Sequence, residues 1–156
     1  MVVVDQLSKT WAVRRLTGEP DVELVGELLQ LHLTYNPGAA FSLGTRFTVA
    51  ITCLACVATV VVLWISRRVA SRVWAVALGL VLAGIDGNLG DRLFREPGPF
   101  RGHVVDFFML PNWPVFNVAD ICINVGVALV LLQILRGVNL DGTRAVKASQ
   151  TDEEEA

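Results

Sequence analysis

An uncharged run of twenty residues, 47–66, is the feature that most constrains the fold of this chain. A helix of that length rises about 30 Å, which matches the hydrocarbon thickness of a lipid bilayer. Of the 156 residues, 53% are hydrophobic, which is too apolar for an ordinary soluble domain. The sequence therefore predicts a small integral membrane protein.

Two further apolar segments, 73–90 and 115–135, are predicted to cross the membrane. The short connection after the first span carries Arg67, Arg68 and Arg72, and basic residues of this kind are typical of cytoplasmic loops. This orientation makes segment 93–114 an extracytoplasmic loop and leaves the tail, 139–156, inside the cell. The tail is poor in apolar residues and ends in acidic ones, so we expect it to be disordered.

The first fifteen residues are apolar but too short to span a bilayer, because a helix of this length rises only about 20 Å. They are similar to the second half of a span, and Asp5 and Lys9 are spaced to pair on one helix face. We expect the natural protein to start upstream, so that the first span is truncated here. The alternative is an amphipathic helix at the membrane surface that ends at Arg14 and Arg15.

Segment 17–46 is polar enough to lie outside the bilayer. Apolar residues alternate in part of it, which favours strands, and the string Asn36-Pro37-Gly38 is a strong turn signal. The predicted fold is an all-α integral membrane bundle of four transmembrane helices, the first truncated, with a small extracytoplasmic β-sheet. Residues 1–138 form this single domain.

Asp120 lies about five residues inside the last apolar run. A carboxylate at such a position costs roughly 2.5–3.5 kcal/mol on insertion scales, so it is expected to face a protein interior or a water-filled cavity and to serve a function. Asp106 precedes it by 14 residues, and Pro111 and Pro114 allow the chain to turn back between them. Two adjacent carboxylates tend to share one proton, and such a pair can activate water and protonate a carbonyl oxygen.

Further polar side chains gather at the same predicted membrane face. Asn88, Asp91 and Arg92 end the second complete span at helical spacing, and Asn117 precedes Asp120 by three residues. Arg92 can neutralise a carboxylate or bind a phosphate. The alternative interpretation is that these groups only cap helices and form ion pairs at the interface.

Other classes of function are less well supported. The net charge of −2 argues against a nucleic-acid partner, and Cys53, Cys56 and Cys122 are an odd number of thiols within apolar runs rather than a disulfide framework. His32 and His103 lack partners at metal-ligand spacing, so no metal and no cofactor are expected. A small transporter or proton-conducting protein that uses intramembrane aspartate stays open as an alternative, as does a non-catalytic membrane subunit.

Five short strings, in order along residues 5 to about 125, resemble the bacterial lipoprotein signal peptidases, also called signal peptidase II. The strings are VVVDQLSK, NPGAAF, GNLGDR, VVDF and FNVAD. The resemblance implies that Asp106 and Asp120 are the catalytic pair of an aspartic endopeptidase. It assigns supporting or substrate-binding roles to ten further residues: Asp5, Lys9, Asn36, Gly38, Phe41, Asn88, Asp91, Arg92, Asn117 and Ala119.

By the same resemblance, the enzyme removes signal peptides from diacylglyceryl-modified prolipoproteins by cutting before the lipidated cysteine. It would be a monomer in the bacterial cytoplasmic membrane, surrounded by lipid, with its active site on the extracytoplasmic side and sensitive to globomycin. Asp86 stands where the family is usually apolar or small, and its role is left open. Gly98 and Gly102 are candidate hinges if loop 93–114 acts as a lid.

Overall fold

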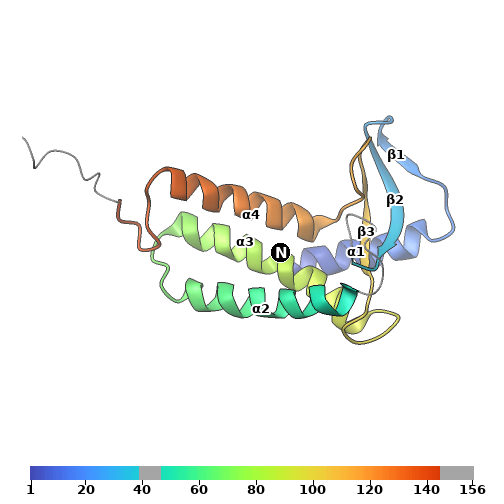
Figure 1. The fold of residues 1–156 in the computed structure, drawn as a ribbon. Helices are drawn as coiled ribbons and strands as arrows, with labels where there is room; N and C mark the ends of the chain where they lie inside the picture. The colour runs from blue at the N-terminus through green and yellow to red at the C-terminus, as the bar shows by residue number, and fades with distance from the viewer. Residues whose placement is uncertain (39–46, 145–156) are drawn as a thin grey trace, which may run out of the picture.

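A computed structural model describes residues 1–38 and 47–144 of the chain. In these residues it contains α1 (Val2–Leu16), β1 (Val22–Val25), β2 (Leu29–Asn36), α2 (Thr48–Ser66), α3 (Arg72–Phe94), β3 (Val104–Met109) and α4 (Val118–Leu135). Helices α2, α3 and α4 lie side by side, the strands cross one end of them, and α1 lies at that same end, running in roughly the direction of the other helices (Figure 1). The sheet and α1 therefore lie at one end of the helical bundle.

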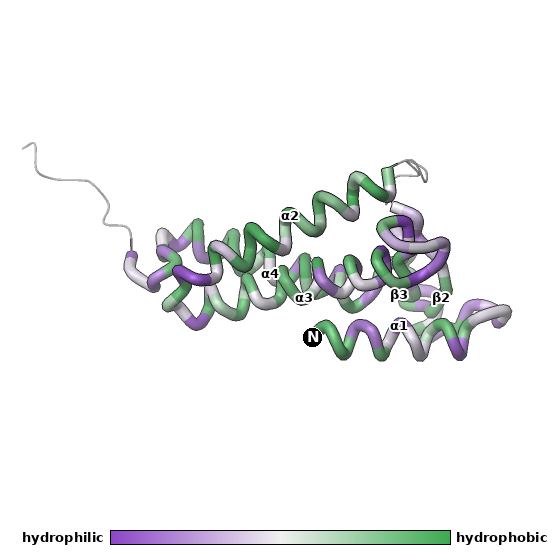
Figure 2. The backbone as a smooth tube through the Cα atoms, turned by 90° about the horizontal axis from the view of Figure 1, so that it is seen from below, coloured by the Kyte–Doolittle hydropathy of each residue, from purple (hydrophilic) through white to green (hydrophobic). Residues whose placement is uncertain are grey.

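Within the described residues, three helices are long and apolar enough to cross a membrane: α2, α3 and α4. They coincide with the predicted spans to within a few residues, apart from the end of α3, which continues to Phe94. Outward side chains such as Leu54 and Val60 are exposed and apolar, as lipid contact requires. The hydropathy colouring shows α2 as mostly hydrophobic along its length (Figure 2). Helix α1 forms as predicted, but with 15 residues it is too short for a span, so the structure does not confirm a fourth transmembrane helix.

Small residues allow α3 and α4 to approach closely. A Cβ atom added at Gly84 of α3 would lie 2.4 Å from the backbone oxygen of Ala119, and one added at Gly126 of α4 would lie 2.8 Å from that of Ala77. Such glycines are typical of helix pairs in membranes, where packing rather than water drives association. Among the described elements α2 contacts α3 alone, and it diverges from the bundle toward its N-terminus (Figure 2).

The three described strands form an antiparallel sheet in the order β1-β2-β3. Strands β1 and β2 confirm the strands expected in segment 17–46, whereas β3 lies in the segment predicted as a loop. Its first four residues are all buried, so it shows none of the alternation that identifies a half-exposed strand. Apolar side chains of α1, β2 and β3, including Ala12, Leu31 and Phe107, form a core beneath the sheet.

The opposite end of the bundle is closed by the segment after α4. The indole nitrogen of Trp74 donates a hydrogen bond to the backbone oxygen of Val138 at 3.0 Å. The backbone oxygen of Leu140 accepts from the nitrogens of Ala70 and Ser71. Residues 139–144, the start of the predicted disordered tail, therefore form a turn that packs at the start of α3, while 145–156 lie outside the described residues.

Candidate active site

The first turn of α4 fixes one of the two candidate catalytic carboxylates. Asn117 is the N-cap residue, and its side-chain oxygen accepts from the backbone nitrogen of Asp120 at 3.0 Å. In return, a carboxylate oxygen of Asp120 accepts a hydrogen bond from the backbone nitrogen of Asn117, also at 3.0 Å. This reciprocal capping box satisfies two backbone donors and holds Asp120 at the helix N-terminus, where the helix dipole favours negative charge.

The second carboxylate, Asp106, is in β3 and is 2% exposed. The backbone of Phe116 pairs with that of Phe108, and this turns the chain back so that α4 begins beside β3. As a result the Asn117 amide nitrogen donates to Asp106 Oδ1 at 2.6 Å. The other oxygen, Oδ2, accepts from the amide of Asn36 on β2 at 3.0 Å.

Asn88 of α3 completes the link between the two carboxylates. Its amide nitrogen donates to Asp120 Oδ1 at 2.9 Å. Its oxygen accepts from Asn117 Nδ2 at 3.1 Å and from Lys9 Nζ at 2.9 Å. Because an ammonium group can only donate, Lys9 fixes which end of the Asn88 amide faces Asp120.

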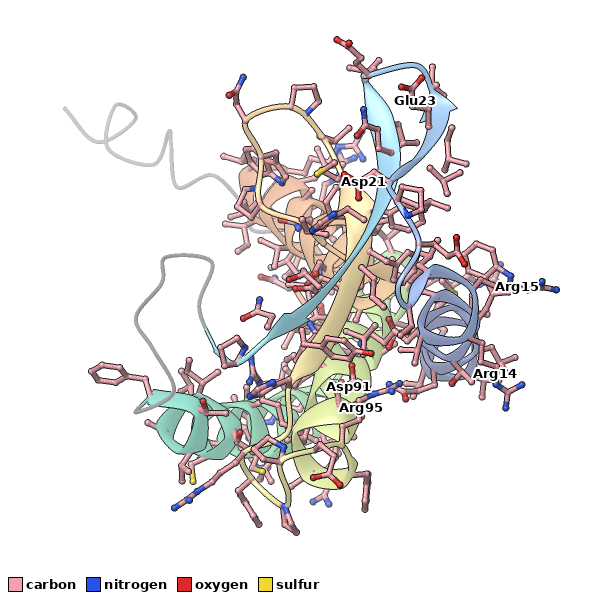
Figure 3. All side chains as sticks on the ribbon, turned by 90° about the vertical axis from the view of Figure 1, so that its right-hand side faces the viewer. Arg14, Arg15, Asp21, Glu23, Asp91 and Arg95 are labelled. Carbon is pink, nitrogen blue, oxygen red and sulfur yellow. The ribbon has the colours of Figure 1, made fainter. Side chains whose placement is uncertain are left out.

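A buried ionic network between α1 and α3 supports this arrangement. Lys9, fully buried, lies 2.9 Å from Asp5 and 3.0 Å from Asp91, so the predicted Asp5–Lys9 pair is confirmed. Asp5 also accepts from the backbone nitrogen of Ala119, which fixes the start of α4 against α1. Asp91 pairs with Arg95 at 2.6 Å near the end of α3 (Figure 3). These contacts offset the cost of burying the charges.

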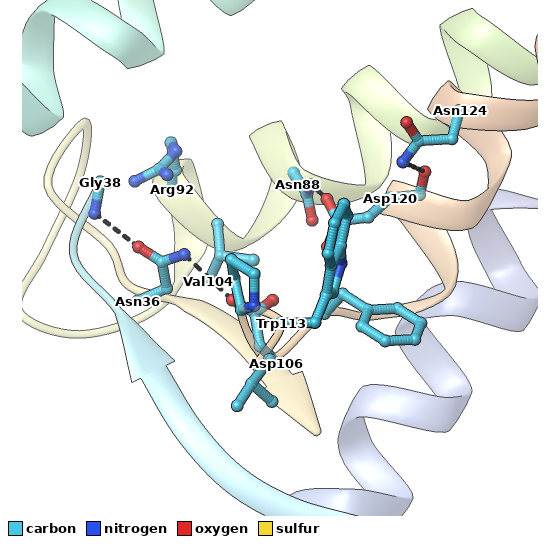
Figure 4. Close-up of a pocket in the computed structure, with 12 residues that line it drawn as sticks. Asn36, Gly38, Asn88, Arg92, Val104, Asp106, Trp113, Asp120 and Asn124 are labelled. Carbon is cyan, nitrogen blue, oxygen red and sulfur yellow. Dashed lines mark hydrogen bonds between the residues drawn. The ribbon is translucent and has the colours of Figure 1, made fainter. Parts of the chain in front are cut away.

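Asp106 and Asp120 open into one cavity of about 520 Å³ (Figure 4). Burial is the largest effect on Asp106 and raises its pKa to about 6; the negative charge of Asp120 acts in the same direction. The hydrogen bonds from Asn36 and Asn117 and the charge of Lys9 lower the pKa in part. The remaining lining residues are Asn36, Gly38, Asn88, Arg92, Val104, Trp113, Pro114, Val115, Phe116 and Asn124.

The structure thus brings most of the sequence-predicted residues together. Asp91 and Asn88 both contact Lys9, but Asp91 is not among the described residues that line the cavity. Asp91 joins α3 to α1 through Lys9, and it accepts a hydrogen bond from the backbone nitrogen of Val105. Ala119 is buried against α3, beside Gly84. Phe41 lies outside the described residues.

Asp86 and Gly102, whose roles the sequence left open, both make close local contacts. Asp86 accepts a hydrogen bond from Thr59 of α2 at 2.8 Å and is not among the described residues of the cavity lining. Gly102 is tightly packed rather than placed as a hinge, because an added Cβ would lie 2.2 Å from the backbone oxygen of Asp91. Among the described residues no group of three or more His, Cys, Asp or Glu side chains is placed to hold a metal ion.

Sequence reasoning missed several contributors to the site. Gln6 donates to Asp91 at 3.1 Å, and its only signal in the sequence was its position beside Asp5. Asn124 lines the cavity one helical turn after Asp120, and a polar residue at that spacing within an apolar run could have identified it. Val104 and Phe116 carried no signal, because their place depends on how the strands pair.

A family model and individual related proteins point to the same family for this chain. The family model described as "Signal peptidase (SPase) II" matches residues 1–136. The lipoprotein signal peptidase of Mycolicibacterium smegmatis is 44% identical over 141 residues, which are 90% of this chain and 60% of that protein. That of Mycobacterium avium is 41% identical over 152 residues, 97% of this chain and 84% of that protein.

A solved bacterial membrane enzyme, determined by the in meso method, has a similar fold, with a TM-score of 0.76 at 24% identity over 86% of this chain and 87% of that one. The chain spans less than two thirds of the length of its M. smegmatis relative and 84% of the length of the M. avium protein. The family match over residues 1–136, together with these relatives, establishes that the chain belongs to the signal peptidase II family.

Proposed function

We propose that this chain is a membrane aspartic endopeptidase that removes signal peptides from diacylglyceryl-modified prolipoproteins, cleaving before the lipidated cysteine. Family membership supports the reaction and the substrate class. The observation that carries the chemistry is the shared cavity of Asp106 and Asp120, each oriented by hydrogen bonds from asparagine amides.

The proposed catalytic form of the pair carries one proton. The raised pKa of Asp106 favours this state, because ionising a second carboxylate beside the first and out of water is costly. The pair is best treated as one titrating unit, with no fixed assignment of the proton to either residue. Arg92 lines the same cavity, and its positive charge would balance the negative charge of the carboxylate pair.

In the proposed reaction the ionised carboxylate takes a proton from water while the water oxygen bonds to the scissile carbonyl carbon. The protonated carboxylic acid donates its proton to the carbonyl oxygen, which gives a neutral tetrahedral diol. In the second step the newly protonated carboxyl group gives its proton to the amide nitrogen, and the C–N bond breaks. The other carboxylate takes back a proton from the diol, so the pair returns to its starting state.

The position of the cavity suits a lipid-anchored substrate. It lies at the end of α3 and the start of α4, opposite the basic connection that carries Arg67 and Arg68. With that connection in the cytoplasm, the cavity faces the extracytoplasmic boundary of the cytoplasmic membrane. Its apolar lining, including Val104, Trp113 and Phe116, would accept the substrate near the depth at which its acyl chains remain in lipid.

The test is cleavage by purified protein of a prolipoprotein with and without the diacylglyceryl group. We expect the lipidated form alone to be cut, at the bond before the modified cysteine, and globomycin to inhibit the reaction. Mass spectrometry of the released signal peptide locates the bond. Equal cleavage of both forms, or no cleavage of the lipidated one, would remove the proposed substrate class.

A further inference from the structure

Asn124 is a polar residue in a helix that otherwise meets the requirements of a membrane span. It is exposed and lines the cavity beside Asp120, four residues away on α4 (Figure 4). Four residues rotate a helix by about 40° beyond a full turn and rise about 6 Å, so the side chain shares the face of Asp120 and lies deeper along the span.

The orientation of the Asn124 amide follows from its one described hydrogen bond. Its nitrogen donates to the backbone oxygen of Asp120 at 2.9 Å, and only the nitrogen can do so because a backbone oxygen accepts. The amide oxygen accepts no hydrogen bond from residues 1–38 or 47–144. Because this oxygen lies at the cavity and is not used by the described residues, it is available to accept from a cavity occupant with an N–H group.

A peptide bond can reach two carboxylates only when its carbonyl is released from helical hydrogen bonds, so the substrate must be extended near the cleavage point. An extended chain advances about 3.3 Å per residue, and the rise of about 6 Å from Asp120 to Asn124 therefore corresponds to about two residues. The part of the substrate deeper in the membrane is the signal peptide. Its extended backbone exposes N–H groups that need acceptors there.

We propose that Asn124 binds the substrate by accepting a hydrogen bond from a backbone N–H about two residues to the signal-peptide side of the scissile bond. The proposal rests on the proposed function. Asn124 takes no proton and makes no bond in the reaction, so its contribution is to fix the register of the peptide in front of Asp106 and Asp120.

The test combines Asn124→Leu with ester analogues of a diacylglyceryl-modified prolipoprotein peptide. In each analogue one amide N–H among the three upstream of the scissile bond is replaced by an ester oxygen, which cannot donate. For the wild type we expect one analogue to lose roughly three- to tenfold in kcat/KM, as for one neutral hydrogen bond. Asn124→Leu should show a similar loss on the all-amide peptide and no additional loss on that analogue.

Two variants separate this contact from folding. Val125→Leu changes the neighbouring, exposed position on α4 and should leave kcat/KM within twofold. Asn124→Thr keeps a hydroxyl acceptor and should cleave better than Asn124→Leu at an equal melting temperature. Equal ester penalties in the wild type and Asn124→Leu would overturn the proposal while leaving the proposed function intact. Failure of the wild type to cleave the all-amide peptide would remove both.

Discussion

Replacing Asp106 by asparagine is expected to stabilise the folded protein at alkaline pH. The carboxyl group is 2% exposed, and burial raises its pKa from 3.8 to about 6. The folded state therefore holds its proton more tightly than the unfolded chain does. Ionising the group in the folded protein costs free energy that an uncharged asparagine does not incur.

The magnitude follows from the difference of about 2 units between these pKa values, at 1.36 kcal/mol per unit, which is about 3 kcal/mol. Stability from this group is fully present below about pH 4 and is lost as pH rises through about 6. At pH 8 the wild type bears the full cost. The asparagine amide presents one oxygen to the two donors Asn36 and Asn117, which costs roughly 1–2 kcal/mol. The net gain at pH 8 is therefore about 1–2 kcal/mol.

Thermal unfolding in detergent between pH 4 and pH 8 measures this effect. For a chain of this size the melting temperature of Asp106→Asn should exceed that of the wild type by roughly 2–8 °C at pH 8. At pH 4 the order should reverse. Glu23→Gln removes an exposed carboxylate from β1 and controls for net charge. A difference for Asp106→Asn that does not change with pH would refute the assignment of the raised pKa.

Three further predictions concern the pH profile, the buried network and the helix packing. Because the active pair needs one proton, kcat/KM should fall above pH 6, approaching tenfold per pH unit; a flat profile to pH 8 would contradict it. Lys9→Met leaves the buried Asp5 without its cation and Asp91 with Arg95 alone, and it should lower the free energy of unfolding by roughly 3–5 kcal/mol, whereas the exposed Arg14→Met should change it little; equal effects would argue against the network. Gly84→Ala should cost roughly 1–3 kcal/mol by separating α3 from α4, while Gly79→Ala, with open space around it, should not; chemical denaturation compares the two.

The membrane helices could be predicted from the sequence because an apolar segment of sufficient length has few alternatives in a bilayer. The Asp5–Lys9 pair could also be predicted from the sequence, since helical spacing alone brings the two side chains together. The capping box at Asn117 is a local pattern of the same kind. In each case the contact is encoded within a few residues.

That Asp106 and Asp120 share one cavity could not be predicted from local sequence patterns. It depends on the pairing of Phe108 with Phe116, which returns the chain to the sheet. The contact from Asn36 to Asp106 spans 70 residues and depends on the register of β2 against β3. Strand β3 itself was missed because burial of both its faces leaves no alternating pattern. Long-range pairing therefore determines the site, and no short sequence pattern records it.

The most direct test of the central claim compares three amide replacements in one cleavage assay. Asp106→Asn and Asp120→Asn remove the carboxylates of the cavity, while Asp86→Asn removes one that accepts from Thr59 outside the described cavity lining. We predict that each of the first two lowers kcat by at least about a thousandfold, within the range of lost acid–base catalysis, and that the third retains near wild-type activity. Substantial cleavage by either Asp106→Asn or Asp120→Asn would contradict the account.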